Sequence, residues 1–211
     1  MGMQEEFIKK LKYDLEIISE EITDILYKED VFTRITIPKL HESDIDPHIR
    51  TTVTKSHYSD MLTSVRRQIT NDQKSSEISL MKLLLRMRKN NTLITKDWYV
   101  KEWLTDSSLL KDNPELAGFI RGIPATEFNN HFGDQFLDPA IIDKDIKILS
   151  EATSGIKAYV DKAIAHRDPS VPNPPSLEKY NNALKELDRI AKKYILLLKQ
   201  VGMPSLKPIL Q

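Results

Sequence analysis

Residues 155–176 read GIKAYVDKAIAHRDPSVPNPPS, and this stretch joins two predicted helices. Its first half carries apolar residues at helical spacing, namely Ile156, Tyr159, Val160, Ala163 and Ile164. The prolines within residues 169–175 then forbid the helix to continue. Ser176 is a good N-cap for a second helix, and Glu178 suits the positive end of that helix dipole. The pattern therefore predicts an elbow between two helices with an exposed end formed by His166, Arg167 and Asp168.

Apolar residues also repeat at helical spacing at both ends of the chain. Over residues 3–28 they are Phe7, Ile8, Leu11, Leu15, Ile18, Ile22, Ile25 and Leu26. In the last helix they form a heptad-like stripe that needs a neighbouring helix, and they are Tyr180, Leu184, Leu187, Ala191, Tyr194, Leu198 and Val201. Gly202 is the natural C-cap of that helix. We therefore predict an all-α fold with several substantial helices and almost no sheet.

A second and a third helix are expected after the first. Asp46 and Pro47 provide a helix start, and an apolar stripe continues from there to about Asn71. Ser75 or Ser76 can cap the third helix, whose apolar residues surround most of its circumference. The third helix is therefore expected to be buried on several sides.

Two more helices are expected in the second half of the chain. Thr95 can cap a short helix that contains both tryptophans, Trp98 and Trp103. A long helix is predicted over residues 138–166, because an Asp-Pro start is followed by apolar residues at helical spacing. Gly155 is the one residue expected to weaken that helix.

Two segments break the helical pattern. Residues 31–47, VFTRITIPKLHESDIDP, are rich in β-branched residues and predict an irregular, extended crossing segment, in which any strand would lie between Val31 and Leu40. About residues 105–137, prolines and glycines divide the chain into short helical pieces, which we interpret as a variable inserted lobe. The composition does not shift enough to demand a second domain, so we expect residues 1–211 to form one domain.

The composition restricts the kinds of partner and site. Lys plus Arg equals Asp plus Glu at 31 each, so any nucleic-acid site must be a local patch. The chain has no cysteine, which excludes disulfides and thiolate chemistry and fits the cytoplasmic location that we expect. The longest apolar run, YILLLKQV, is shorter than the roughly 20 residues that span a bilayer, and the N-terminus lacks a signal-peptide pattern, so we expect no membrane partner.

Three motifs resemble one protein family. AIAHRD, residues 163–168, followed by a proline-rich loop and a long helix, resembles the HEPN superfamily (higher eukaryotes and prokaryotes nucleotide-binding), in particular its AbiU-type abortive-infection branch. HYSDMLTSVRRQITND, residues 57–72, and SSEISLMKLLLRMRKN, residues 75–90, look like that branch's double-arginine helix and the leucine-rich helix after it. The motifs cover about half the chain. The resemblance implies a HEPN-like helical bundle with the double-arginine, histidine and last helices at its centre.

The resemblance also implies a role for His166. In catalytic HEPN ribonucleases an arginine shortly before the histidine joins it in cleaving RNA without a metal, through the 2′-hydroxyl. The matching window here, residues 159–161, contains no arginine, and its Asp161 would repel a phosphate. Apart from the resemblance, a histidine at a helix C-terminus can titrate near neutral pH and act as a general acid or base. The alternative is that His166 and Asp168 merely cap the helix and fix the elbow.

Arg66 and Arg67 are candidates to replace the missing cation. Adjacent arginines point about 100° apart on a helix, so one can face the bundle while the other reaches its mouth. An inward arginine needs an anion, and we favour an internal salt bridge with Asp161 or Asp168 over a nucleic-acid phosphate, because buried charges are normally paired. The predicted catalytic residues are His166 and Arg66, and the predicted binding residues are Arg67, Arg167 and Asp168.

The remaining histidines show no metal-ligand spacing. His57 lies one turn before Met61 on an apolar face, and we interpret it as a packed, hydrogen-bonded residue. His41, His48 and His131 lie in or beside predicted loops, so we predict no metal site. The sequence has no dinucleotide, phosphate-loop or hydrolase-elbow motif, so we expect no cofactor.

These observations lead to one expected function and to alternatives. The resemblance implies a bacterial defence or toxin–antitoxin-type protein that binds or acts on RNA through a degenerate ribonuclease site, and whether it is an enzyme stays open. The expected partners are a second copy in a homodimer, RNA, and a cognate antitoxin or partner protein. The heptad-like stripe and the segment with Trp98 and Trp103 also favour the homodimer. The alternatives are a non-catalytic dimerisation or partner-binding module and a nucleotide-binding module.

Overall fold

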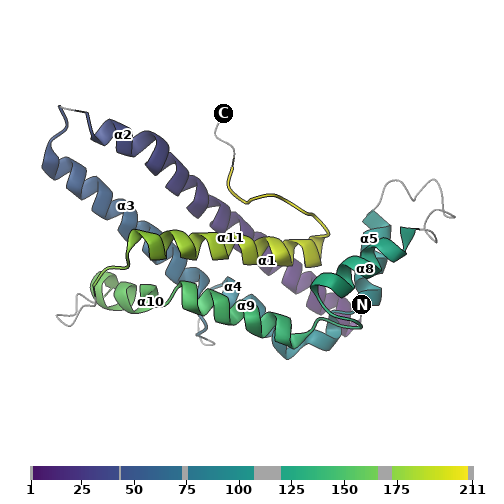
Figure 1. Ribbon diagram of the computed structural model, residues 1–211. Coiled ribbons are helices and arrows are strands. Elements are labelled where there is room, and N and C mark those ends of the chain that lie inside the picture. The colour runs from purple at the N-terminus through teal and green to yellow at the C-terminus, as the bar shows by residue number, and fades with distance from the viewer. Residues whose placement is uncertain (1, 43, 73–75, 107–119, 166–172, 209–211) are drawn as a thin grey trace.

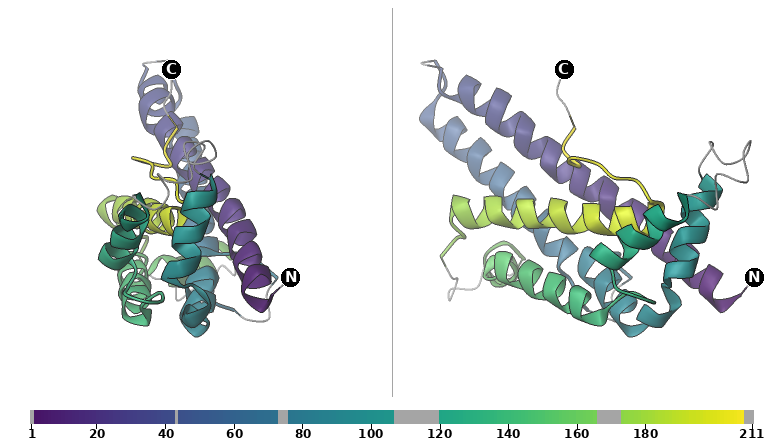
Figure 2. Two further views of the ribbon diagram at one scale, coloured as in Figure 1. Left: turned by 90° about the vertical axis from the view of Figure 1, so that its right-hand side faces the viewer. Right: turned by 45° about the vertical axis from the view of Figure 1, so that its right-hand side comes forward.

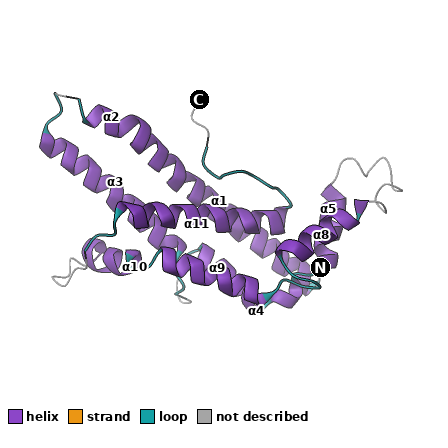
Figure 3. Cartoon of the chain, in the orientation of Figure 1, coloured by secondary structure: helices purple, strands orange, loops and turns teal. Residues whose placement is uncertain are grey.

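The computed structural model describes residues 2–42, 44–72, 76–106, 120–165 and 173–208. These ranges form helices and contain no β-strand, and a single antiparallel bridge joins Thr95 to Phe136 (Figure 3). The all-α fold predicted from the helical periodicity is therefore confirmed. No helix in these ranges combines the length and the apolar character that crossing a bilayer requires.

Helix α1, Met3–Val31, and helix α3, Pro47–Gln68, form a long hairpin (Figure 1). The core-facing residues of α1 are those whose spacing predicted it, namely Ile8, Leu11, Leu15, Ile18, Ile22 and Ile25. Asp46 caps α3 by accepting a hydrogen bond from the backbone N–H of His48 at 2.6 Å. The helix start predicted at Asp46 is confirmed.

The segment after α1 is helical, and the prediction of an irregular or strand-forming crossing segment is wrong. A π-helical turn, Phe32–Thr36, continues directly into α2, Ile37–Leu40. Phe32 and Leu40 are buried, and their burial outweighs the weak helix propensity of the β-branched residues between them. The wider π turn ends just before Pro38, whose missing N–H would interrupt a regular α-helical ladder.

Helix α4, Leu80–Lys89, begins later than the sequence predicted. Its cap is Ser79, whose Oγ accepts a hydrogen bond from a backbone N–H of the first turn at 3.2 Å. Ser76 is exposed, and Ser75 lies outside the described residues. Ser79 is buried and also donates to the carbonyl oxygen of Thr70 at 2.7 Å. Because this contact holds Ser79 beside the end of α3, Ser79 is the residue that caps α4. The predicted burial of the third helix on several sides is confirmed for Leu80, Met81, Leu83, Leu84 and Met87.

Helices α5, Lys96–Asp106, and α8, Gly122–His131, pack together at one end of the bundle (Figure 1). Thr95 accepts a hydrogen bond from the backbone N–H of Trp98 at 3.1 Å, as its predicted capping role requires. An aromatic cluster with ring centroids 5.5–6.0 Å apart fills the contact between the helices and consists of Tyr99, Phe128 and Phe132. Helix α8 lies within the lobe predicted for residues 105–137, of which residues 107–119 lie outside the described ranges.

The single long helix predicted over residues 138–166 is interrupted. Helix α9, Pro139–Ala152, begins at the predicted cap, Asp138, which accepts a backbone hydrogen bond at 2.8 Å. Gly155 then has a φ of +85°, a left-handed conformation that glycine adopts easily and that breaks the helix. The short helix α10, Ile156–Tyr159, and a π-helical turn, Val160–Ala165, follow. Gly155, the residue expected to weaken the helix, is thus the site of the break.

Helix α11, Leu177–Lys199, packs against both α1 and α9 (Figures 1 and 2). Ser176 caps it, as predicted, by accepting a hydrogen bond from the backbone N–H of Lys179 at 3.2 Å. The buried members of the heptad-like stripe are Tyr180, Leu184, Leu187, Ala191, Tyr194 and Leu198. Val201, the last predicted member, lies beyond the helix and is 48% exposed. The neighbouring helices that this stripe needs are therefore supplied by the same chain.

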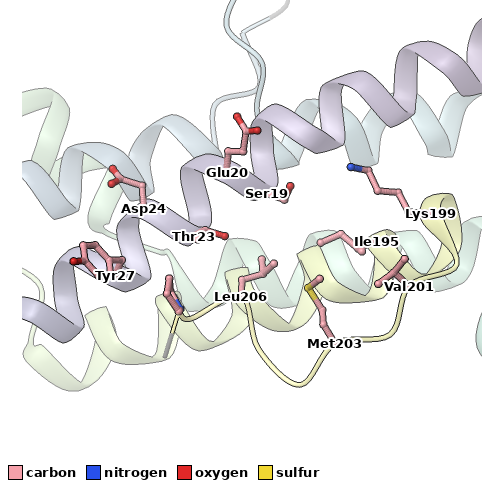
Figure 4. Close-up of a pocket in the computed structure, with 11 residues that line it drawn as sticks. Ser19, Glu20, Thr23, Asp24, Tyr27, Ile195, Lys199, Val201, Met203 and Leu206 are labelled. Atoms are coloured by element: carbon pink, nitrogen blue, oxygen red, sulfur yellow. The ribbon is translucent and has the colours of Figure 1, made fainter. Parts of the chain in front are cut away.

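The C-terminal tail leaves α11 earlier than predicted. Gln200, with a φ of +52°, is the C-cap, in place of the predicted Gly202. The tail then returns along α1, where Leu206 is buried and a groove of about 520 Å³ remains (Figure 4). Asp188 on α11 accepts a hydrogen bond from the backbone N–H of Leu206 at 2.8 Å. Because the tail folds back onto α11 and α1, the helix ends before the glycine.

We expect Ile22→Ala to destabilise the protein by about 2–5 kcal/mol, because it leaves a cavity in the fully buried face of α1. Ile49→Ala on α3 is the matched control, since Ile49 is 54% exposed and its truncation should change stability by less than about 0.5 kcal/mol. Urea unfolding followed by circular dichroism measures both. Equal losses in the two variants would contradict the described packing.

Candidate functional site

The structure places two of the five predicted site residues. Arg66 and Arg67 lie in the last turn of α3. His166, Arg167 and Asp168 lie outside the described residues. The Arg66 side chain is 28% exposed, whereas Arg67 is an exposed residue. One arginine therefore turns toward the bundle and its neighbour toward solvent, as expected for adjacent residues on a helix.

Arg66 forms an internal salt bridge. Its Nε donates to Oδ1 of Asp161 at 2.9 Å, and a terminal nitrogen donates to the hydroxyl of Thr70 at 3.1 Å. Lys157 Nζ lies 3.8 Å from the other oxygen of Asp161. The internal bridge that the sequence favoured is confirmed, and Asp161 is its anion. The bridge fastens the π-helical turn after α10 to the end of α3.

A cavity of about 660 Å³ lies next to this bridge, between α3, α10 and the start of α11. Its lining combines tyrosine rings with apolar and small polar side chains, namely Thr54, Lys55, Tyr58, Ser59, Leu62, Tyr159, Pro174, Pro175, Leu177 and Tyr180. Leu62 is one turn before Arg66 on the same face of α3, and Tyr159 is two residues before Asp161. The cavity and the salt bridge therefore share α3, and the turn that carries Asp161 follows directly on the helix that carries Tyr159.

A hydrogen-bonded network lies behind the cavity wall. The hydroxyl of Tyr180 donates to Oε2 of Glu29 at 2.9 Å, and Nε2 of His57 lies 3.0 Å from the same oxygen. The His57 ring stacks on Phe32 with centroids 3.7 Å apart and planes inclined by 8°. His57 and Glu29 are only 13% and 17% exposed. The interpretation of His57 as a packed, hydrogen-bonded residue is confirmed.

The network sets the protonation of its members. Burial alone would raise the pKa of Glu29, but hydrogen bonds from His57, Tyr180 and Thr33 outweigh burial and hold that pKa below its ordinary value. Burial, reinforced by the nearby Glu29 carboxylate, raises the pKa of Tyr180, so that its phenol stays protonated and remains a donor. The pKa of Tyr58 is raised by the same two causes. Glu29 is therefore a partly buried anion whose charge the surrounding donors stabilise.

Sequence reasoning missed the residues that form the cavity. Tyr180 carried only a packing signal as a member of the heptad-like stripe, and Tyr58 and Tyr159 appeared as apolar positions of two helices. The three tyrosines come from separate helices and meet only in the folded chain. Their one sequence signal is the concentration of tyrosine on the inward faces of α3, α10 and α11.

Comparisons with known proteins identify no family. A scan against protein-family models, a search of curated proteins and a search of solved structures each found no match. The likeness to HEPN proteins rests on the sequence motifs. In the ranges that the structure describes, no group of three or more His, Cys, Asp or Glu side chains is arranged to hold a metal ion.

We expect acidification to unfold the protein partly through Glu29. A carboxyl whose pKa is lower in the folded than in the unfolded state contributes stability above the unfolded pKa, near 4.3, and loses it as the pH falls through the folded value. The free energy of unfolding should therefore fall from about pH 5 toward pH 3, and it should fall less steeply in Glu29→Gln.

Denaturant titrations at a series of pH values measure this slope. Glu20→Gln is the control, because Glu20 is an exposed carboxylate on the same helix and its removal should leave the slope unchanged. A Glu29→Gln slope equal to that of the unmodified protein would show that the network does not stabilise the Glu29 charge.

Proposed function

We propose that the chain is a HEPN-like protein of a bacterial defence or toxin–antitoxin system that binds RNA and cleaves it weakly or not at all. The observation that carries this proposal is the bridge between Arg66 and Asp161. The bridge keeps cations at the end of α3, where RNA phosphates can reach them. It also commits Arg66, the arginine predicted to act in catalysis, to an internal partner.

The end of α3 supports RNA binding because it is locally positive in a neutral chain. Arg67 is exposed and forms no ion pair with another residue in the described part of the chain. Arg66 and Lys157 share the single carboxylate of Asp161. Arg67 thus adds an exposed cation beside a carboxylate that two other cations already share. A local patch of this kind is what the balanced overall composition requires of a nucleic-acid site.

The same contacts argue against efficient cleavage. Metal-independent cleavage needs a preorganised cation beside the phosphate on which charge develops. Arg66 is committed to two acceptors, and the Asp161 carboxylate repels an approaching phosphate. His166, which the resemblance assigns to proton transfer, lies outside the described residues. We propose that it contacts the RNA.

The proposal includes a cytoplasmic homodimer and a cognate antitoxin or partner protein. This part rests on the resemblance, because the sequence features that favoured a dimer are occupied within one chain. The heptad-like stripe of α11 packs on α1 and α9. Trp98 is half-buried, and the ammonium of Lys12 lies 5.7 Å from its ring centroid.

We expect Arg67→Ala to weaken binding of a single-stranded RNA and Asp161→Asn to strengthen it. Asparagine keeps an oxygen that can accept the hydrogen bond of Arg66, while the charge that repels phosphate is lost. Loss of one phosphate contact should reduce the slope of log K against log salt concentration by about 0.7. Fluorescence anisotropy at several salt concentrations measures affinity and slope.

Arg121→Ala is the control for these variants, because Arg121 is an exposed arginine that directly precedes α8, and α8 lies apart from α3 (Figure 1). Its binding should equal that of the unmodified protein. Two outcomes would contradict the proposal. One is RNA affinity that is equal in all four proteins, and the other is robust metal-free cleavage that both His166→Ala and Arg66→Ala abolish.

Light scattering over a concentration series checks the oligomeric state. We expect the mass to reach that of two chains, because the resemblance implies a dimer. A mass of one chain at the highest concentration would refute the homodimer and leave the RNA-binding proposal to its own test.

A further inference from the structure

We propose that the cavity between α3, α10 and α11 binds one nucleotide, with the base inside and the phosphate at the rim beside Lys55. This inference deepens the proposed function, because it names the part of the RNA that would enter the cavity. A free mononucleotide carries the same chemistry. The volume of about 660 Å³ lies within the roughly 300–1,000 Å³ of small-molecule sites.

The walls suit a planar aromatic ring. Tyr58, Tyr159 and Tyr180 line the cavity from three different helices. The rings of Tyr58 and Tyr180 meet edge to face, with centroids 5.8 Å apart and planes inclined by 88°. Edge-to-face packing and the burial of Tyr180 hold these two rings in place before a ligand arrives. Preformed aromatic walls are the feature on which unstacked nucleobases bind in single-stranded RNA complexes.

Two of the tyrosines have hydrogen-bonding capacity to spare. The Tyr180 hydroxyl is committed to Glu29. The hydroxyls of Tyr58 and Tyr159 bond to no other residue within the described ranges, although both side chains are half-buried. Both hydroxyls are therefore available to bond to a ligand that enters the cavity. The ring nitrogens and exocyclic groups of a nucleobase can donate to and accept from a phenol.

Charge orients the ligand. Lys55 is exposed at the rim and forms no ion pair with another described residue. At the deep end, the Glu29 carboxylate lies directly behind Tyr180. An anionic group is therefore attracted to the rim and repelled from the floor, so that a nucleotide enters base first. A neutral planar ligand such as a nucleoside would lack the contribution of Lys55.

The inference predicts separable effects of ring and charge. Tyr159→Leu removes the ring at similar bulk and should weaken binding of adenosine 5′-monophosphate about tenfold or more, as loss of one stacking contact does. Tyr159→Phe keeps the ring and should retain most of the affinity. Lys55→Ala should weaken binding of adenosine 5′-monophosphate and leave binding of adenosine unchanged. Tyr13→Leu is the control, because Tyr13 is 56% exposed on α1.

Isothermal titration calorimetry with these two probes measures the affinities, and circular dichroism melts confirm that each variant is folded. Competition between adenosine 5′-monophosphate and a single-stranded RNA shows whether the base in the cavity belongs to RNA. Loss of nucleotide affinity in Tyr159→Leu supports the inference, even if the RNA neither competes nor binds, in which case only the proposed function fails. No measurable binding of adenosine 5′-monophosphate, or equal affinity in Tyr159→Leu and Tyr13→Leu, overturns the inference and leaves the test at Arg67 unaffected.

Discussion

The burial of the apolar stripe of α11 against α1 and α9 is the contact on which the rest of the structure depends. Hydrophobic burial is not directional, so it brings the helices together without fixing their register. Three buried carboxylates fix the register of the helices, because each is bonded to specific partners. Asp14 pairs with Lys10 and Arg86, and Asp30 pairs with Arg34 and Lys207. Asp145 pairs with Arg189 and Lys193 and accepts a hydrogen bond from the hydroxyl of Tyr194. A displaced helix would leave such a carboxylate buried without its partners, which is far more costly than losing an exposed ion pair. Apolar side chains thus make up most of the core, and the buried ion pairs set how the helices align.

The sequence predicted the fold well where one periodic pattern could be satisfied by one buried face. Helices α1, α3 and α11 and their capping residues follow from local spacing and from Asp46 and Ser176. The prediction failed where a distant contact decided the local structure. Residues 32–40 are helical because Phe32 and Leu40 are buried, and α4 begins at Leu80 because Ser79 bonds to Thr70. Local helix propensity carries no information about either of these distant contacts.

Part of the candidate site was also predictable from the sequence. An internal salt bridge of Arg66 with Asp161 or Asp168 was predictable, because a cation that faces a helical bundle needs a nearby carboxylate, and Asp161 is the partner that the structure shows. The cavity was not predictable. Tyr58, Tyr159 and Tyr180 are far apart in sequence, and tyrosine at an inward helical position ordinarily signals packing. That they also line a cavity depends on the break at Gly155, which gives α10 a direction separate from that of α9.

The short element that carries Tyr159 gives Asp161 a structural role. Helix α10 and the π-helical turn after it follow a left-handed glycine and are too short to be stable alone. The bridge from Asp161 to Arg66 fastens them to α3, and it lies two residues from the tyrosine that lines the cavity. An arginine at residue 161 would face Arg66 and remove this anchor through like-charge repulsion. The carboxylate that disfavours phosphate chemistry at the bridge is therefore the group that holds the cavity wall in position.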